Sequence, residues 1–126
     1  GFTMNAIART VVFTLATCLS AGALASERMA HAKGLPADTL AEAVSNLARH
    51  NQQLEALIAQ PMTSQQLDEV HLLSYTLENA LRRIDHDLKQ IAENLEAVHI
   101  ASERNDPATV QRQGRAYLDG VRPLAR

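Results

Sequence analysis

Apolar residues first recur at alternating spacings of three and four in the segment that follows Pro36. This is the period of a helix that buries one side, so we expect a helix that begins near Pro36 or Asp38. Its apolar positions are Leu40, Val44, Leu47, Leu54 and Ile58. Asn51 fills the gap in this stripe and is predicted to set the register by a hydrogen bond across the interface. Pro61 should end the helix near Ala59.

A second, longer segment runs from Thr63 to about Arg104 without a glycine or a proline. One continuous apolar stripe follows it: Val70, Leu73, Leu77, Leu81, Ile84, Leu88, Ile91, Leu95 and Val98. We therefore predict one long helix. Thr63 and Gln66 have the spacing of a capping box, in which the hydroxyl accepts a backbone N–H and the glutamine side chain reaches back to the cap.

A third, shorter helix is predicted from Pro107 to about Asp119. Asp106 is a suitable N-cap residue, and proline is favoured at the first helical position. Gly120 and Pro123 are expected to end the element. The residues expected to face inward are Val110, Gly114, Tyr117 and Val121.

These three segments predict an all-α fold in which one long central helix is packed by two shorter antiparallel helices. Short loops make neighbouring helices antiparallel, which would bring Asn51 near Ser74. A cross-section of only two helices buries little apolar surface. Either the helices fold into a compact bundle, or two chains pair through their long helices as a coiled coil with four-helix cross-sections. The apolar residues Leu72 and Ile100, which lie off the stripe, favour such a homodimer.

The first 25 residues have the zones of a secretory signal peptide. Arg9 precedes an apolar stretch from Val11 to Leu24, and Ala23 and Ala25 provide a small-residue cleavage site. Residues 1–3 precede a plausible start, residues 26–34 are expected to form a flexible tail, and residues 35–126 the helical domain. We expect cleavage after Ala25, a periplasmic location, and no membrane segment after cleavage.

The only cysteine, Cys18, lies inside this signal peptide, in a context that partly resembles a lipoprotein acylation box. Cleavage after Ala25 leaves a chain with no thiol. Its stability in an oxidising compartment then depends on packing and not on disulfides.

After cleavage the chain is slightly acidic, with eleven Lys and Arg residues against fourteen Asp and Glu residues. This balance argues against a nucleic-acid partner. Tyr75 and Tyr117 are its only aromatic side chains besides histidine, so an aromatic-lined ligand pocket is not expected.

Three histidines, His50, His71 and His99, are candidate metal ligands, but no two lie three or four residues apart on one helical face. We expect His99 to lie in the core, hydrogen-bonded to a Ser or Gln side chain. A catalytic alternative makes His71 a base held by Glu78, although no nucleophile is identifiable. The structural interpretation has Tyr75 packing its ring and donating its hydroxyl to a neighbouring helix.

Three sequence blocks, HLLSYTLENALRRID, ENLEAVHIASERND and GRAYLDG, cover roughly Leu67 to Gly120. They resemble a family of short exported proteobacterial proteins that is classed as a domain of unknown function. The shared pattern joins His71, Tyr75, Leu77, Glu78 and Ala80 with the later His99 and Tyr117. The resemblance implies a location in the bacterial envelope and a helical fold, and it implies no activity.

Two other families share single features with the chain. The segment from Met62 to Gln66 is similar to the Leu-Thr-x-x-Gln motif of periplasmic stress chaperones, but a single capping box explains it equally well. Helical-bundle cytochromes would need Met62 and His99 as axial ligands, and these lie far apart along the long helix. No cofactor is therefore expected.

The sequence favours a non-catalytic periplasmic helical protein that acts by binding an unknown protein partner. Two alternatives stay open. One is a metal-binding or metal-sensing protein that uses His50, His71 or His99, and the other is a holdase-like stress chaperone.

Overall fold

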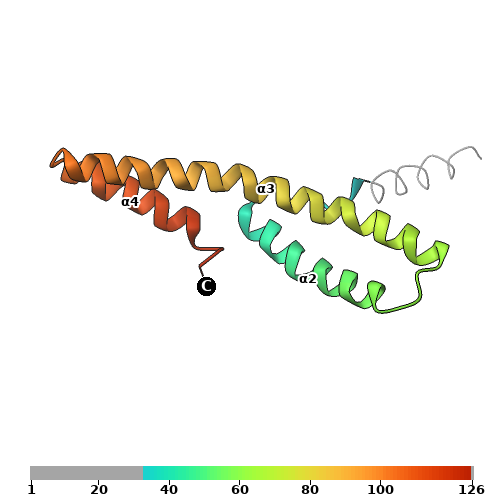
Figure 1. The fold of residues 1–126 in the computed structure, drawn as a ribbon. Helices are drawn as coiled ribbons and strands as arrows, with labels where there is room; N and C mark the ends of the chain where they lie inside the picture. The colour runs from blue at the N-terminus through green and yellow to red at the C-terminus, as the bar shows by residue number, and fades with distance from the viewer. Residues whose placement is uncertain (1–32, 126) are drawn as a thin grey trace, which may run out of the picture.

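The computed structural model of the protein describes residues 33–125 and contains three α-helices within them (Figure 1). They are α2 (Leu40–Ile58), α3 (Ser64–Glu103) and α4 (Pro107–Val121). These residues include no β-strand. The predicted all-α fold, with one long helix and two shorter ones, is confirmed. The expectations for the signal peptide, for Cys18 and for residues 26–32 lie outside the described residues.

Each helix begins at a side chain that caps it. Thr39 Oγ1 accepts the Glu42 N–H at 3.1 Å, so α2 starts slightly later than the expected Pro36 or Asp38. Asp106 accepts the Thr109 N–H at 3.1 Å, and Pro107 takes the first helical position of α4, as predicted.

The predicted capping box at the start of α3 is only half formed. Thr63 Oγ1 accepts the Gln66 N–H at 3.5 Å, but the Gln66 side chain contacts the Thr63 hydroxyl and not the backbone of the cap. The Thr63 N–H donates instead to the carbonyl of Pro61 at 3.0 Å. The loop therefore satisfies the donor that the glutamine was expected to satisfy.

The turn between α3 and α4 is a Schellman motif. Asn105 takes a left-handed conformation with φ of 54°, its N–H donates to Ser102 O at 3.3 Å, and the Asp106 N–H donates to Ala101 O at 3.0 Å. Asparagine tolerates this backbone conformation better than most residues. The same three residues, 105–107, thus end one helix and begin the next.

Gly120 does not end the third helix, contrary to the prediction. It lies inside α4, where a Cβ would come 3.1 Å from Ile91 Cγ1 of α3. The missing side chain lets the two helices approach closely, and α4 ends one residue later at Val121.

The helices form two successive hairpins that share α3. In Figure 1, α2 runs beside one half of α3 and α4 beside the other half, both in the reverse direction. Each contacts α3, and among the described elements α2 and α4 share no contact. The compact three-helix bundle that the sequence left open is therefore not formed, and each cross-section contains two helices.

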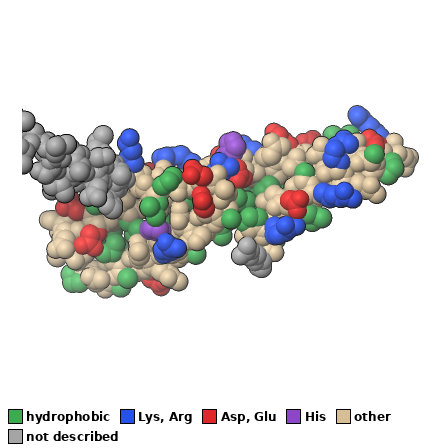
Figure 2. Space-filling model, turned by 180° about the vertical axis from the view of Figure 1, so that it is seen from behind, with side chains coloured by type: hydrophobic (Ala, Val, Ile, Leu, Met, Phe, Trp, Pro, Cys, Tyr) green, Lys and Arg blue, Asp and Glu red, His purple; other side chains and the backbone are tan. Residues whose placement is uncertain are grey.

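The buried core is correspondingly small. Its apolar members are Leu40, Ala43, Ala80, Ile91 and Ala101. Three of these five are alanines, which let helix backbones approach closely but bury little area. Many large apolar side chains remain partly exposed, and Figure 2 shows hydrophobic side chains at the surface among charged ones. Within residues 33–125 no helix contains a stretch apolar enough to cross a bilayer.

Candidate functional site

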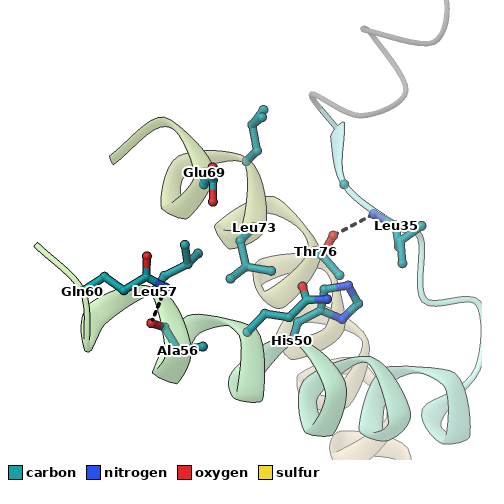
Figure 3. A pocket seen from close by; sticks show the side chains of 11 residues that line it. Leu35, His50, Ala56, Leu57, Gln60, Glu69, Leu73 and Thr76 are labelled. Carbon is teal, nitrogen blue, oxygen red and sulfur yellow. Dashed lines mark hydrogen bonds between the residues drawn. The ribbon is translucent and has the colours of Figure 1, made fainter. Parts of the chain in front are cut away.

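An apolar groove of about 680 Å³ lies between α2 and α3 (Figure 3). Its walls are apolar, its rim carries amide and carboxylate groups, and one end contains a buried histidine and threonine. The walls are Ala56, Leu57, Leu72 and Leu73, the rim is Gln53, Gln60 and Glu69, and the remaining lining residues are Gly34, Leu35, His50 and Thr76. This volume lies within the roughly 300–1,000 Å³ typical of ligand pockets.

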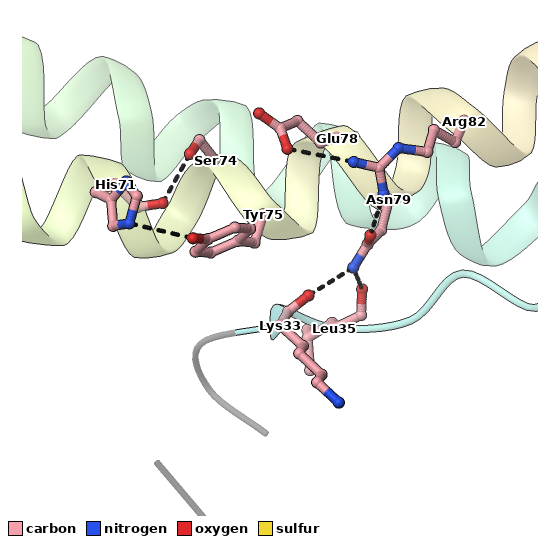
Figure 4. Close-up of polar contacts among 8 residues, drawn as sticks. All are labelled: Lys33, Leu35, His71, Ser74, Tyr75, Glu78, Asn79 and Arg82. Carbon is pink, nitrogen blue, oxygen red and sulfur yellow. Dashed lines mark hydrogen bonds and ion pairs between the residues drawn. The ribbon is translucent and has the colours of Figure 1, made fainter. Parts of the chain in front are cut away.

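Residues 33–35, here called the N-terminal strap, close one end of the groove. The Leu35 N–H donates to Thr76 Oγ1 at 2.9 Å. Asn79 Nδ2 donates to Lys33 O at 2.8 Å and to Leu35 O at 3.0 Å (Figure 4). The expected flexible tail of residues 26–34 therefore differs from the structure at its last two residues, which dock on α3.

Gly34 makes this docking sterically feasible. Its φ is +73°, a left-handed conformation that glycine adopts without steric penalty. A Cβ at this position would come 2.5 Å from Thr76 N and 2.7 Å from the backbone carbon of Tyr75. The strap can approach the α3 backbone this closely only because residue 34 has no side chain.

His50 lies at the same end of the groove and is 8% exposed (Figure 3). Its Nδ1 is 2.8 Å from Asn46 O. Because a carbonyl only accepts hydrogen bonds, Nδ1 carries the proton, and Nε2 is the acceptor in the neutral ring. Nε2 has no partner among the described residues and is not sealed from solvent. It is therefore available to a group that enters the groove.

The predicted stripe of α2 is correct at Leu40, Leu47 and Leu54, and it is wrong by one residue at Asn51 and Ile58. Asn51 is exposed, and the inward position belongs to His50. The buried positions of α2 run through Ala43 and His50, and Ile58, placed in the stripe by the sequence, is 61% exposed. Asn51 therefore forms no polar layer with Ser74, whose hydroxyl donates to His71 O of its own helix at 2.7 Å.

His71 and Tyr75 pair with each other along α3 (Figure 4). Tyr75 Oη lies 3.2 Å from His71 Nε2, and the two rings meet edge to face with centroids 5.1 Å apart. The tyrosine hydroxyl thus bonds within its own helix. The expected bond to a neighbouring helix is not formed. Glu78 pairs with Arg82 at 3.4 Å, so it does not hold His71 as the catalytic alternative required.

His99 is exposed, which corrects the expectation of a core histidine. Its Nε2 lies 3.1 Å from Glu103 Oε1, one turn further along α3. Ser102 Oγ donates to the His99 backbone carbonyl at 2.7 Å and not to the ring. Tyr117 is half-buried on α4, as its inward position predicted.

The three candidate metal ligands do not converge. His50 lies in the groove, His71 contacts Tyr75, and His99 lies in the half of α3 beyond the groove. Within residues 33–125 no group of three or more His, Cys, Asp or Glu side chains could hold a metal ion. His31 lies outside these residues.

Two carboxylates outside the groove have shifted pKa values. Hydrogen bonds from His86 and then from Arg83 lower the pKa of Asp87, against the opposing effect of desolvation. Hydrogen bonding to Thr109, from its side chain and then from its N–H, lowers the pKa of Asp106. Both groups stabilise local helix structure and lie away from the groove.

Gly34, Thr76 and Asn79 could not be identified as site residues from the sequence. A threonine at position 76 is weak evidence for a site, because a threonine inside an amphipathic helix is also common on exposed faces. Gly34 was interpreted as part of a tail because no apolar period surrounds it. Only the three-dimensional contact links these residues.

The family comparison matches nearly the whole chain. The model of a family described as "Family of unknown function (DUF6746)" matches residues 4–126. No curated protein and no solved structure matches the chain. The match includes every residue that carries the groove and the strap, and it agrees with the resemblance noted from the sequence. The chain belongs to this family of unknown function.

Proposed function

We propose that the protein is exported to the periplasm and acts there, without catalysis, by binding a protein partner in the groove between α2 and α3. The apolar groove with its polar rim is the observation that carries the proposal. Export is supported by the segment from Met4 to Ala25, which has the composition of a cleavable signal peptide. A chain without cysteine after cleavage suits an oxidising compartment.

The groove is suited to a short amphipathic helix of the partner. Its lining on each side spans about two helical turns, from His50 to Leu57 on α2 and from Glu69 to Thr76 on α3, and Gln60 lies just beyond the end of α2. A helix in such a groove would present apolar side chains at three- and four-residue spacing. Glu69 is the only charged residue among the described residues of the lining, so it favours a lysine or arginine of the partner at that end. At the other end, His50 Nε2 favours a hydrogen-bond donor.

The absence of catalysis is inferred from how the polar side chains are used. His50 donates its Nδ1 proton to a backbone carbonyl, and His71 pairs with a tyrosine. Glu78 is engaged by Arg82. His71 and Glu78 therefore form no base-and-orienter pair, and among the described residues no nucleophile is hydrogen-bonded to His50.

Site-specific photocrosslinking in the exporting cell tests the proposal. A benzophenone amino acid replaces Gln53 or Gln60 at the groove rim, and Gln90, an exposed glutamine in the other half of α3, serves as the matched control. We expect an adduct of one defined mass from each rim position, none from Gln90, and loss of the adduct in Leu72→Asp. Equal labelling at all three positions, or none at the rim, would refute the proposed groove.

A holdase-like chaperone is the second candidate, because the same groove is concave and partly apolar. Such a protein should suppress the aggregation of a heat-denatured model enzyme, measured by light scattering, and Leu72→Asp should abolish the suppression. A specific partner site predicts unchanged aggregation. The alternative of a metal-binding protein has weaker support, since its three candidate histidines share no site in the described part of the chain.

A further inference from the structure

Four leucines form a row along α3 that no part of residues 33–125 covers completely. They are Leu67, Leu81, Leu88 and Leu95, with exposed fractions of 55%, 55%, 44% and 45%. The last three lie seven residues apart, and the first lies fourteen residues before the second. Seven residues make about two helical turns, so this leucine row lies on one face of α3.

A second set of apolar residues with the same repeat lies beside the leucine row. These residues are partly or fully buried against α2 and α4: Leu77, Ile84, Ile91 and Val98. Together the two sets alternate at spacings of three and four, which is the pattern of a coiled-coil seam. α2 and α4 cover one side of this seam and leave the leucine side open.

The leucine row is separate from the groove. Leu72 of the groove wall lies nine residues before Leu81, which is about two and a half turns, so the two residues lie on opposite sides of α3. A molecule bound in the groove therefore does not cover the leucine row.

The size of the open face suits a second long helix. With two antiparallel α3 helices centred on Leu88, residues 73–103 of each overlap over about 45 Å, and a helix is about 10–12 Å wide, which gives a footprint of about 500 Å² per chain on α3 alone. Standard interfaces bury about 800 Å² per partner. The flanks of α2 and α4 beside α3 would supply the remainder once two chains pair.

The charges beside the leucine row favour an antiparallel arrangement. Arg82 follows Leu81 by one residue, and Glu96 follows Leu95 by one residue. In a parallel pair each of these two groups would face its own copy, which is repulsive, whereas an antiparallel pair brings Arg82 toward the partner's Glu96. The present partner of Arg82 is Glu78, in an exposed pair on its own helix that contributes little and can be exchanged.

We propose that a second copy of this chain packs against the leucine row, with the two α3 helices antiparallel. Leu81 then lies against the partner's Leu95, and Leu88 against the partner's Leu88, because the leucines form the open side of the seam. Each half of the dimer contains α3 and α2 of one chain together with α3 and α4 of the other. The two-helix cross-sections of the single chain become four-helix cross-sections.

Sedimentation equilibrium of the tag-free mature chain tests the association. We expect a dimer at micromolar concentration and, for Leu88→Glu, dimerisation weaker by at least about tenfold, because a symmetric dimer contains the substituted leucine twice. Leu72→Glu is the matched control: the sequence pattern assigned Leu72 to the dimer contact, but it is 45% exposed on the opposite side, so this variant should leave the dimer intact. Unchanged helicity by circular dichroism shows that each variant folds. A monomeric wild type, or equal effects of the two variants, would overturn the proposal.

Crosslinking tests the orientation, and the mature chain offers no cysteine of its own to interfere. The proposed register places Glu78 beside the partner's His99. A mixture of Glu78→Cys and His99→Cys chains should therefore form a crosslinked heterodimer with a short bismaleimide, and each variant alone should not. In a parallel pair each variant would crosslink with itself and the mixture would contain no crosslinked heterodimer. That result would overturn the antiparallel arrangement.

Discussion

Replacing Thr76 by valine removes the hydrogen bond that holds the N-terminal strap while keeping the shape of the side chain. Thr76 is 5% exposed, and its hydroxyl accepts the Leu35 N–H at 2.9 Å. A net hydrogen bond contributes about 0.5–1.5 kcal/mol, and a donor left buried without a partner costs about 1–3 kcal/mol. The Leu35 N–H is only partly buried, so we expect a loss near the middle of this range, about 1–2 kcal/mol.

Urea unfolding followed by circular dichroism measures this loss, and hydrogen exchange locates it. The Leu35 amide should exchange faster in Thr76→Val, whereas amides of α4 should be unaffected because α4 contacts α3 elsewhere and does not touch α2. Thr76→Ser is the control, since it keeps the hydroxyl and removes one methyl group. If Thr76→Val is as stable as the wild type while Thr76→Ser is destabilised, packing and not the hydrogen bond holds the strap, and the reasoning fails.

Three further outcomes are expected. Gly34→Ala should lower the midpoint of thermal unfolding more than Thr76→Val does, because alanine is strained at φ of +73° and its Cβ would meet the Thr76 backbone; an unchanged midpoint would contradict the strap geometry. Thr109 lowers the pKa of Asp106. The stabilisation of α4 by the Asp106 carboxylate is therefore present above the ordinary carboxyl pKa of 3.8 and disappears as the pH falls through the lowered value. Asp106→Asn keeps an N-cap residue but cannot titrate. Between pH 5 and pH 2 the helicity of this variant, measured by circular dichroism, should therefore fall less than that of the wild type. Parallel curves would argue against stabilisation of α4 by the Asp106 charge. Calorimetric titration of the mature chain with Zn(II) and Cu(II) should detect no binding tighter than about micromolar, and nanomolar binding would instead revive the metal-binding alternative.

The helices themselves could be predicted closely from the sequence. Their starts and ends depend on local signals that need no tertiary information: Thr63 and Asp106 as caps, Pro61 as a breaker, and Pro107 at a first position. A long run without glycine or proline was enough to predict that α3 is continuous. These elements could be predicted because neighbouring residues alone decide them.

The buried faces were harder to predict because small residues carry them. In α2 the stripe through Leu40 and Leu47 can be continued through Asn51 or through His50. The spacing of the apolar residues does not show which of these two polar residues faces inward. Ala43, 0% exposed, marks the correct one, but alanine adds little to an apolar pattern. The sequence predicts a helix end at Gly120, because glycine commonly follows helices. Its contact with Ile91 joins residues far apart in the chain and leaves no local pattern.

The candidate site was the least predictable part. The groove is formed by the spacing between α2 and α3 and is closed by a strap whose hydrogen bonds span more than forty residues. The residues that could be singled out from the sequence, such as His71 and His99, proved to interact with neighbours one turn away. Of the candidate histidines, only His50 reaches the groove.

The continuous α3 helix, to which α2 and α4 attach without touching each other, is the single connection between the two hairpins within residues 33–125. Forty residues of helix extend about 60 Å, so the groove near one end and the Schellman turn at the other are held a fixed distance apart. Since α2 and α4 share no contact within the described residues, the bending stiffness of this one helix determines that distance in the single chain. A glycine or proline introduced near the middle of α3 would leave each hairpin its own contacts and convert the straight helix into a hinge.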